Sequence, residues 1–251
     1  MRKIIIDTDT ATDDAVAIMM ALKNDSFNIK AITTVAGNVD LNQATSNALY
    51  TCEICDKFVP VYKGEGHPLK RKLETSKFFH GKDGLGDTGP YEPSKKAEAE
   101  NATNQIISLI NKYPNEIEII AIGPLTNIAK VFKYEPSVTT QIYGYLNKKN
   151  FEDLEKINTT LSKFAINIQK KGLEYYKIKY NEHKIDLADP LAMAVMIDDE
   201  DTNYERCNIK IILDGDERGK DIISFNKNGN IKLATHVSRT NFLNTLKKSL
   251  A

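Results

Sequence analysis

The sequence predicts an α/β protein with a mainly parallel, Rossmann-like open sheet flanked by helices and a small antiparallel appendage near the C-terminus. In the first half, short β-branched apolar runs alternate with segments whose apolar residues recur at helical spacing. This alternation indicates right-handed βαβ units and a parallel sheet. In the last third, short apolar runs are separated only by turns, which indicates antiparallel pairing.

The strands and helices of the first half follow one another closely. Asp40 stands where a helix N-cap is expected, directly after a turn at Ala36-Gly37-Asn38. Gly64 and Gly66 close the third apolar run. The expected strands are 3–8, 29–35, 59–62 and 117–122, and the expected helices begin at about 13, run from 40 to about 57, and span 97–112.

The last third contains three short runs typical of strands, at 208–213, 222–225 and 231–234. Asp214-Gly215 and Asn228-Gly229 supply the turns between them. A helix over about 239–250 closes the chain. The length of 251 residues fits a single domain over 1–251 better than two complete domains.

Composition limits the partners of this protein. The 34 Lys and Arg residues equal the 34 Asp and Glu residues in number, so no charge bias favours nucleic acid or an anionic membrane. Ile4–Ile6 are too few for a signal-peptide core, and no apolar run approaches the roughly 18 residues that span a bilayer. We therefore expect a soluble, cytoplasmic protein with no membrane or nucleic-acid partner.

Three cysteines, an odd number, argue against a disulfide framework. Cys52 and Cys55 form a C-x-x-C, but they follow a helical apolar pattern and no second Cys pair or nearby His completes a zinc site. We interpret both as buried helix residues rather than as a redox or metal site.

A concentration of acidic residues lies at the end of the first predicted strand and directly after it, in the run Asp7-Thr8-Asp9-Thr10-Ala11-Thr12-Asp13-Asp14. Ligands of open α/β sheets bind beyond the carboxyl ends of the strands. Four carboxylates within eight residues repel one another unless a cation neutralises them, and a hard divalent ion held by oxygens does this well. The alternative is one helix cap with the other carboxylates solvated.

This run resembles the D-x-D-x-x-x-D-D-A signature of inosine-uridine preferring nucleoside hydrolases. Four further motifs resemble that family in the same order. They are Thr33-Thr34-Val35-Ala36-Gly37-Asn38, Phe79-His80-Gly81-Lys82-Asp83-Gly84-Leu85-Gly86, Ala121-Ile122-Gly123-Pro124-Leu125-Thr126-Asn127 and Ala188-Asp189-Pro190-Leu191-Ala192.

The resemblance implies calcium-dependent hydrolysis of the N-glycosidic bond of a small-molecule ribonucleoside, which gives ribose and free base. By similarity, one Ca²⁺ is held by Asp9, Asp14, the main-chain carbonyl of Thr126 and Asp189. Asp9 would also accept the proton of the attacking water. Family members are commonly dimers or tetramers, which implies a homo-oligomer.

The resemblance further assigns Asp13 and Asn38 to the ribose hydroxyls. The residue that activates the leaving base is unassigned, because Ala188 stands where family members often carry His or an aromatic residue. His80 is a candidate for this role, and a loop-packing histidine is the other interpretation. The motifs give no preference between purine and pyrimidine.

One segment of the family pattern is missing near 137–138. Lys133 to Ser137 resembles the stretch before an I-M-G-G strand end and an E-F-N ribose clamp, and Val138 to Gln141 resembles the stretch after them. Ala165-Ile166-Asn167 does not match E-F-N, and its apolar register fits a helix. Losing three ribose contacts would slow the reaction by roughly 10³- to 10⁶-fold.

Three explanations of this gap stay open: a natural paralogue, an artificially shortened chain, or a longer protein of which residues are omitted. They make a catalytically impaired or inactive protein that binds metal and a ribosyl ligand the main alternative function. A remote alternative is a haloacid-dehalogenase-like phosphatase, which begins with D-x-D-x-T/V. Here Ala11 occupies the last position of that motif, and Asp13 and Asp14 would have no role.

Overall fold

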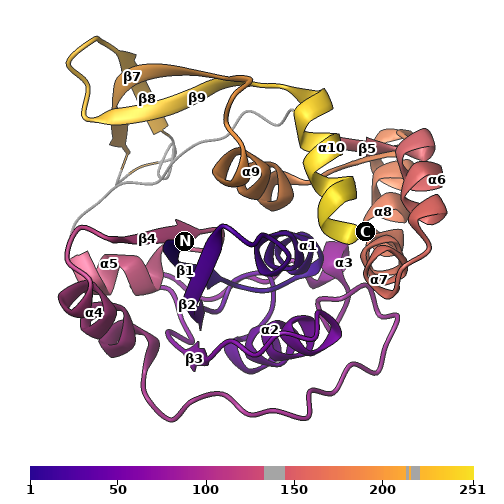
Figure 1. Ribbon diagram of the computed structural model, residues 1–251, viewed down its shortest axis with the longest axis horizontal. Coiled ribbons are helices and arrows are strands. Elements are labelled where there is room, and N and C mark those ends of the chain that lie inside the picture. Colours follow the sequence, from indigo (N-terminus) through magenta and orange to yellow (C-terminus); the bar gives the residue numbers. More distant parts are fainter. Residues whose placement is uncertain (133–144, 213–214, 216–220) are drawn as a thin grey trace.

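The computed structural model describes residues 1–132, 145–212, 215 and 221–251. Strands and helices alternate through most of this length, as the sequence predicts (Figure 1). The elements of the first half are β1 (Arg2–Thr8), α1 (Thr12–Leu22), β2 (Phe27–Thr34), α2 (Leu41–Ile54), β3 (Val61–Lys63), α3 (Lys77–His80), α4 (Ala102–Lys112), β4 (Ile117–Ala121) and α5 (Thr126–Phe132).

A four-stranded sheet in the order β3-β2-β1-β4 forms the centre of this half, and all its strand pairs are parallel. The predicted parallel sheet is therefore confirmed, with strand bounds shifted by one or two residues. β1 lies between β2 and β4, and its residues Ile4, Ile5 and Ile6 are fully buried. Because both faces of β1 are covered, its sequence is continuously apolar rather than alternating.

The two faces of the sheet are covered by different helices (Figure 1). Ile4 and Ile6 belong to the large core that includes α1 and part of α2, whereas Ile5 packs with Ile106 and Leu109 of α4. Asp40 accepts a hydrogen bond from Gln43 N, so the predicted N-cap of α2 is confirmed.

A second group of elements covers the far side of α1. It comprises β5 (Tyr145–Asn147), α6 (Lys148–Ile157), α7 (Thr160–Ile168), α8 (Lys170–Tyr180), β6 (Lys184–Asp186) and α9 (Ala188–Ile197). α9 and the C-terminal α10 (Arg239–Leu250) pack against α1. Ten of the eleven α1 residues are buried as a result, including Asp14.

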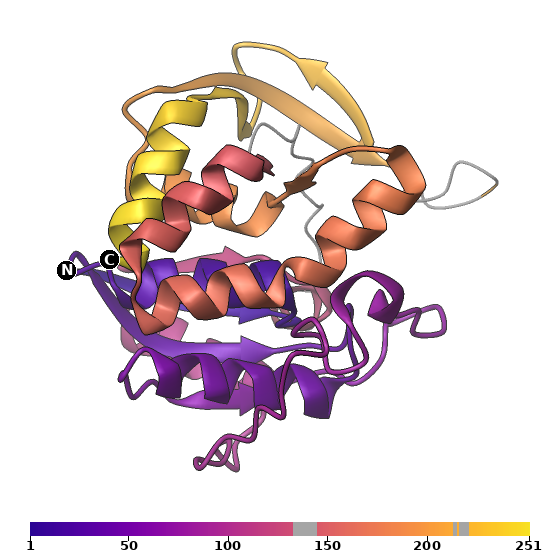
Figure 2. The same ribbon diagram turned by 90° about the vertical axis from the view of Figure 1, so that its right-hand side faces the viewer.

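The small antiparallel sheet that the sequence predicts is present, in the order β8-β7-β9. Its strands are β7 (Thr202–Ile211), β8 (Asp221–Phe225) and β9 (Ile231–Val237). Figure 2 shows it from the side, as the orange and yellow strands at the opposite end of the molecule from the parallel sheet. The predicted C-terminal helix over 239–250 matches α10.

The predicted gap between Ser137 and Val138 lies outside the described residues. Ala165 is buried within α7, as its helical register predicts. Cys52 and Cys55 are buried, and this burial raises the pKa of both thiols to about 12, so the interpretation of both as buried residues is confirmed. Among the described residues, no helix is both long enough and apolar enough to cross a membrane.

The burial of α10 against the main core predicts that the chain unfolds as one unit. Phe242 is 1% exposed and belongs to the same core as α1. Replacing it by alanine should destabilise the protein by roughly 3–5 kcal/mol through the cavity that remains. Calorimetry should show a single transition shifted to lower temperature, and a separate transition for the C-terminal third would contradict the one-domain arrangement.

Candidate functional site

The acidic run predicted from the sequence forms the connection from the carboxyl end of β1 to the first turn of α1. Asp14 is the third residue of α1 and fixes this turn. Its Oδ1 accepts a hydrogen bond from Thr8 Oγ1 at 2.5 Å, and its Oδ2 accepts one from the backbone N–H of Ala11 at 3.0 Å. Asp14 therefore binds back to the residue before the helix, as an acidic N3 residue does in a capping box.

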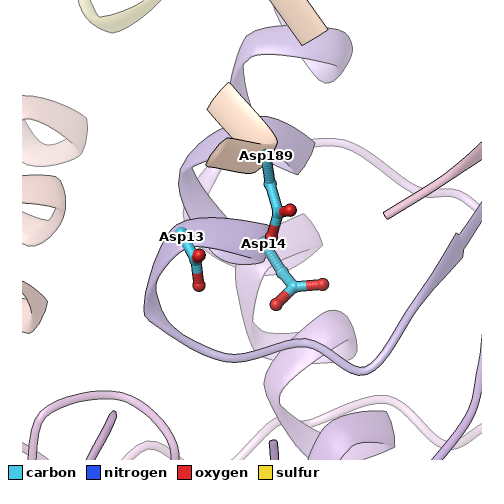
Figure 3. A group of neighbouring side chains, drawn as sticks. All are labelled: Asp13, Asp14 and Asp189. Atoms are coloured by element: carbon cyan, nitrogen blue, oxygen red, sulfur yellow. The ribbon is translucent and has the colours of Figure 1, made fainter. Parts of the chain in front are cut away.

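Three carboxylates meet at this helix start, and one comes from a distant part of the chain. Asp13, Asp14 and Asp189 each offer a carboxylate oxygen, and these oxygens all lie within 4.8 Å of one another (Figure 3). Asp189 is in the first turn of α9, so the packing of α9 on α1 brings it to the site. This spacing suits oxygen ligands around one divalent cation.

Asp9 lies beside this group at the end of β1 and is 3% exposed. Its Oδ2 accepts a hydrogen bond from the backbone N–H of Asn38 at 2.6 Å. A Cβ on Gly37 would overlap that oxygen, so the turn after β2 needs glycine there to approach so closely. Asp9 is thus held in one orientation by the end of the neighbouring strand.

Burial raises the pKa of every carboxyl in this cluster, and repulsion between carboxylates adds to the rise for Asp9, Asp14 and Asp189. Loss of hydration is the largest cause for each. It raises the pKa of Asp13 and Asp14 to about 6, and Asp13 adds repulsion to Asp14. The pKa values of Asp9 and Asp189 rise well above the usual value, again through burial first and then through the neighbouring carboxylates. A bound cation would reverse this penalty.

His80 is the basic side chain next to the cluster and lies at the end of α3. Its Nδ1 is 2.7 Å from Thr12 Oγ1 and 3.7 Å from Asp13 Oδ1. Burial lowers the pKa of His80 to about 4, so the imidazole is neutral near pH 7 in the metal-free protein. Asp13 Oδ1 is buried and has no hydrogen-bond partner among the described residues, so it can accept a hydrogen bond from a ligand.

Two polar residues that the sequence did not single out support this loop from outside. Gln169, between α7 and α8, donates from Nε2 to Thr12 O at 2.9 Å. Asn47 of α2 donates to Thr10 O and to Asp83 O, both at 2.9 Å, and so joins the acidic loop to the glycine loop. Neither residue is in a recognisable motif, because the backbone oxygens they bind are distant in sequence.

The remaining predicted residues lie at the same end of the sheet. Thr126 is the first residue of α5 and is 9% exposed. Gly123, in the turn before it, lies so close to Asp9 that an added Cβ would be 2.7 Å from the Asp9 nitrogen. Asn38 is half-buried and meets Asp9 through its backbone N–H. Asn167 of α7 accepts a hydrogen bond from Lys170 Nζ, at the start of α8.

Comparison with known proteins gives this geometry a family context. The family model described as inosine-uridine preferring nucleoside hydrolase matches residues 4–146. Uridine nucleosidase 1 of Arabidopsis thaliana is 42% identical over 142 residues, which are 56% of this chain and 42% of that protein. The matched part of this chain thus spans less than half the length of that relative.

Two solved structures are similar over almost their whole length. The plant nucleoside hydrolase PpNRh1 superposes with a TM-score of 0.89 at 27% identity, over 99% of this chain and 98% of that chain. A purine-preferring ribonucleoside hydrolase from Gardnerella vaginalis superposes with a TM-score of 0.89 at 26% identity, over the same shares.

The raised pKa values predict how the metal-free protein depends on pH. Burial raises the pKa of Asp7, Asp13 and Asp14 from 3.8 to about 6, so the folded state binds more protons than the unfolded state between these values. Stability should therefore fall as the pH rises through this window. His80 acts in the opposite sense, because its pKa falls from 6.5 to about 4 on folding.

These three carboxyl groups, together with Asp9 and Asp189, whose pKa values also rise, oppose one imidazole. We therefore expect a higher melting temperature at pH 5 than at pH 7.5 in the presence of EDTA. Circular dichroism melting curves measure this. A melting temperature that is higher at pH 7.5 under these conditions would show that the buried carboxyl groups are not protonated in the folded state.

Proposed function

The chain belongs to the inosine-uridine preferring nucleoside hydrolase family, and from this premise we propose that it hydrolyses the N-glycosidic bond of ribonucleosides with the help of Ca²⁺. The products are ribose and the free base. The observation that carries the proposal is the meeting of Asp13, Asp14 and Asp189 oxygens within 4.8 Å, beside the buried Asp9.

The donor set fits a calcium ion. The cluster offers carboxylate oxygens in a buried place where their own repulsion raises their pKa values, and Ca²⁺ prefers six to eight oxygen ligands. Following the family motifs, we assign Asp9, Asp14, Asp189 and the main-chain carbonyl of Thr126 as the ligands. Asp13 has an oxygen within 4.8 Å of those of Asp14 and Asp189, and we assign it to the ribose instead. When bound, the ion would lower the pKa of the attacking water and would bind ribose hydroxyls.

Protein side chains around the ribose would activate the water and bind the sugar. Asp9 accepts the proton of the water, and the Asn38 N–H that binds its Oδ2 keeps the carboxylate in place. Asp13 and Asn38 bind the ribose hydroxyls, and the unpaired Oδ1 of Asp13 is available for such a donor. The negative carboxylates also stabilise the positive charge that develops on the ribosyl group as the bond to the base breaks.

We assign His80 to the leaving base. Its Nδ1 is committed to Thr12 Oγ1, which fixes the orientation of the ring. With a pKa of about 4 the ring is neutral, so it assists the departing base as a hydrogen-bond donor rather than as an imidazolium. Ala188 adds no such group at the start of α9.

The second candidate function is binding of metal and a ribosyl ligand without turnover. It is favoured by the sequence gap at 137–138 and by Ala165, which is buried in α7 where no clamp carboxylate is present. It predicts calcium-dependent thermal stabilisation with no base release. The family match leaves the phosphatase alternative without support.

The proposed hydrolysis predicts that inosine or uridine releases free base when incubated with the purified chain and Ca²⁺. Both nucleosides are needed, because the similar proteins include a uridine nucleosidase and a purine-preferring hydrolase. EDTA should abolish the release, and Asp9→Ala should reduce it at least about 1,000-fold, because it removes both a ligand and the general base.

Asp25→Ala is the matched control, since Asp25 is exposed outside the site. Chromatography of the free base provides the measurement. An intact, folded chain that releases no base from either nucleoside would contradict the proposal. It would favour the binding function if Ca²⁺ still raised the melting temperature.

If His80 assists the leaving base, its replacement should reduce turnover without affecting calcium binding. Asn places its Nδ2 near the position of the His Nδ1, so His80→Asn keeps a partner for Thr12 while it removes the rest of the ring. We expect the turnover number to fall on the order of 100-fold with calcium affinity unchanged. A variant with full turnover would show that His80 only packs the loop.

A further inference from the structure

Asn127 joins the carboxyl ends of three parallel strands through its side chain. Its Nδ2 donates to Asp7 Oδ1 of β1 at 2.8 Å and to Thr34 O of β2 at 3.0 Å. Its Oδ1 accepts from the backbone N–H of Glu65, just beyond β3, at 2.9 Å. Asn127 is fully buried, so no water competes for these bonds.

Asp7 is the anchor of this arrangement on the central strand. It is fully buried, and its Oδ1 also accepts a hydrogen bond from Thr33 Oγ1 at 2.6 Å. Asp7 is the one carboxylate of the acidic run that lies outside the proposed calcium and ribose contacts. Asp7 lies on β1, two residues before Asp9, which directly follows this strand. The hydrogen bond from Asn127 to Asp7 therefore links the Asn127 side chain to the strand that leads to the general base.

The residue next to Asn127 is Thr126, whose carbonyl is a proposed calcium ligand. The turn that leads to it rests on the same strand, because Ile122 N and Gly123 N both donate to Asp7 O, at 2.8 and 3.3 Å. The Asn127 side chain then fixes the far end of this turn. These contacts, none of which involves a proposed ligand side chain, therefore help to place Thr126 relative to Asp9.

We infer that Asn127, held by Asp7, is a positioning residue that keeps the Thr126 carbonyl and Asp9 in the relative placement that calcium binding requires. This inference rests on the proposed calcium site. Partners outside the ligand set commonly change metal affinity by roughly 10- to 100-fold when they are removed. The ligand class concerned is a hard divalent cation bound through oxygens.

Gly64 offers a test that leaves every polar residue in place. A Cβ on Gly64 would overlap the Asn127 side chain, so Gly64→Ala must displace it. Gly66, two residues on, is the matched control, because its added Cβ would meet only Leu41 Cδ2, at 3.9 Å. Neither glycine is among those with a positive φ, so alanine suits both backbones.

The experiment is titration calorimetry of CaCl₂ into the chelator-treated 251-residue chain and its variants. We expect Gly64→Ala and Asn127→Ala each to weaken calcium binding by roughly 10-fold or more, with Gly66→Ala within about twofold of the unchanged protein. The double variant Gly64→Ala/Asn127→Ala should bind no worse than Asn127→Ala, because the overlap is then gone.

Unchanged calcium affinity in Asn127→Ala would overturn the inference, even if its metal-free melting temperature falls, since Asn127 would then be merely structural. Additive losses in the double variant would show that Gly64→Ala acts by another route. If Gly64→Ala does not fold, Asn127→Ala still tests the inference, because it removes the positioning side chain and introduces no steric overlap. An unchanged protein that binds no calcium also overturns it, whereas calcium binding without base release contradicts only the proposed hydrolysis.

Discussion

The structure depends on the crowding of like charges in a place that water reaches poorly. Asp9 and Asp14 are buried, Asp189 is half-buried, and all of them face other carboxylates. A folded chain accepts such a cluster only if protons or a cation neutralise it. The simplest use of this arrangement is a site that is protonated in the metal-free protein and releases these protons when it binds a divalent ion.

The scaffold brings the carboxylates together through three different links. Asp9 directly follows β1, Asp13 and Asp14 lie in the first turn of α1, and Asp189 lies in the first turn of α9. α1 is covered by α9 and α10 on the side away from the sheet, so its charged first turn faces protein rather than solvent. The same packing that stabilises the core therefore removes water from the site.

Local patterns in the sequence were sufficient to predict the four parallel strands and the helices α1, α2 and α4, although α4 begins at Ala102 rather than at 97. The short helices α3 and α5 were not predicted. The isoleucines of β1, the Asp40 cap and the acidic run each act within a few residues, so their meaning is visible without the structure. The placement of the acidic run at the carboxyl end of the sheet was also predictable, because the run directly follows an apolar strand. That a ligand binds there stays a prediction.

Contacts between distant segments were not predictable in this way. Gln169 and Asn47 bind backbone oxygens of the acidic loop from other elements, and nothing in their own neighbourhoods indicates that use. The role of Asn127 likewise depends on the register that sets Asp7 beside Thr33 and Ala121. Motif matching identifies such a residue, whereas only the three-dimensional arrangement shows what it holds.

A crystal structure of the chain grown in millimolar CaCl₂ would show directly whether the acidic cluster binds calcium. We expect one ion among Asp9, Asp14, Asp189 and the Thr126 carbonyl, with oxygen distances of about 2.3–2.6 Å. A structure that shows no ion, with the carboxyl groups hydrogen-bonded directly to one another, would contradict this expectation and mean that protons alone neutralise the cluster.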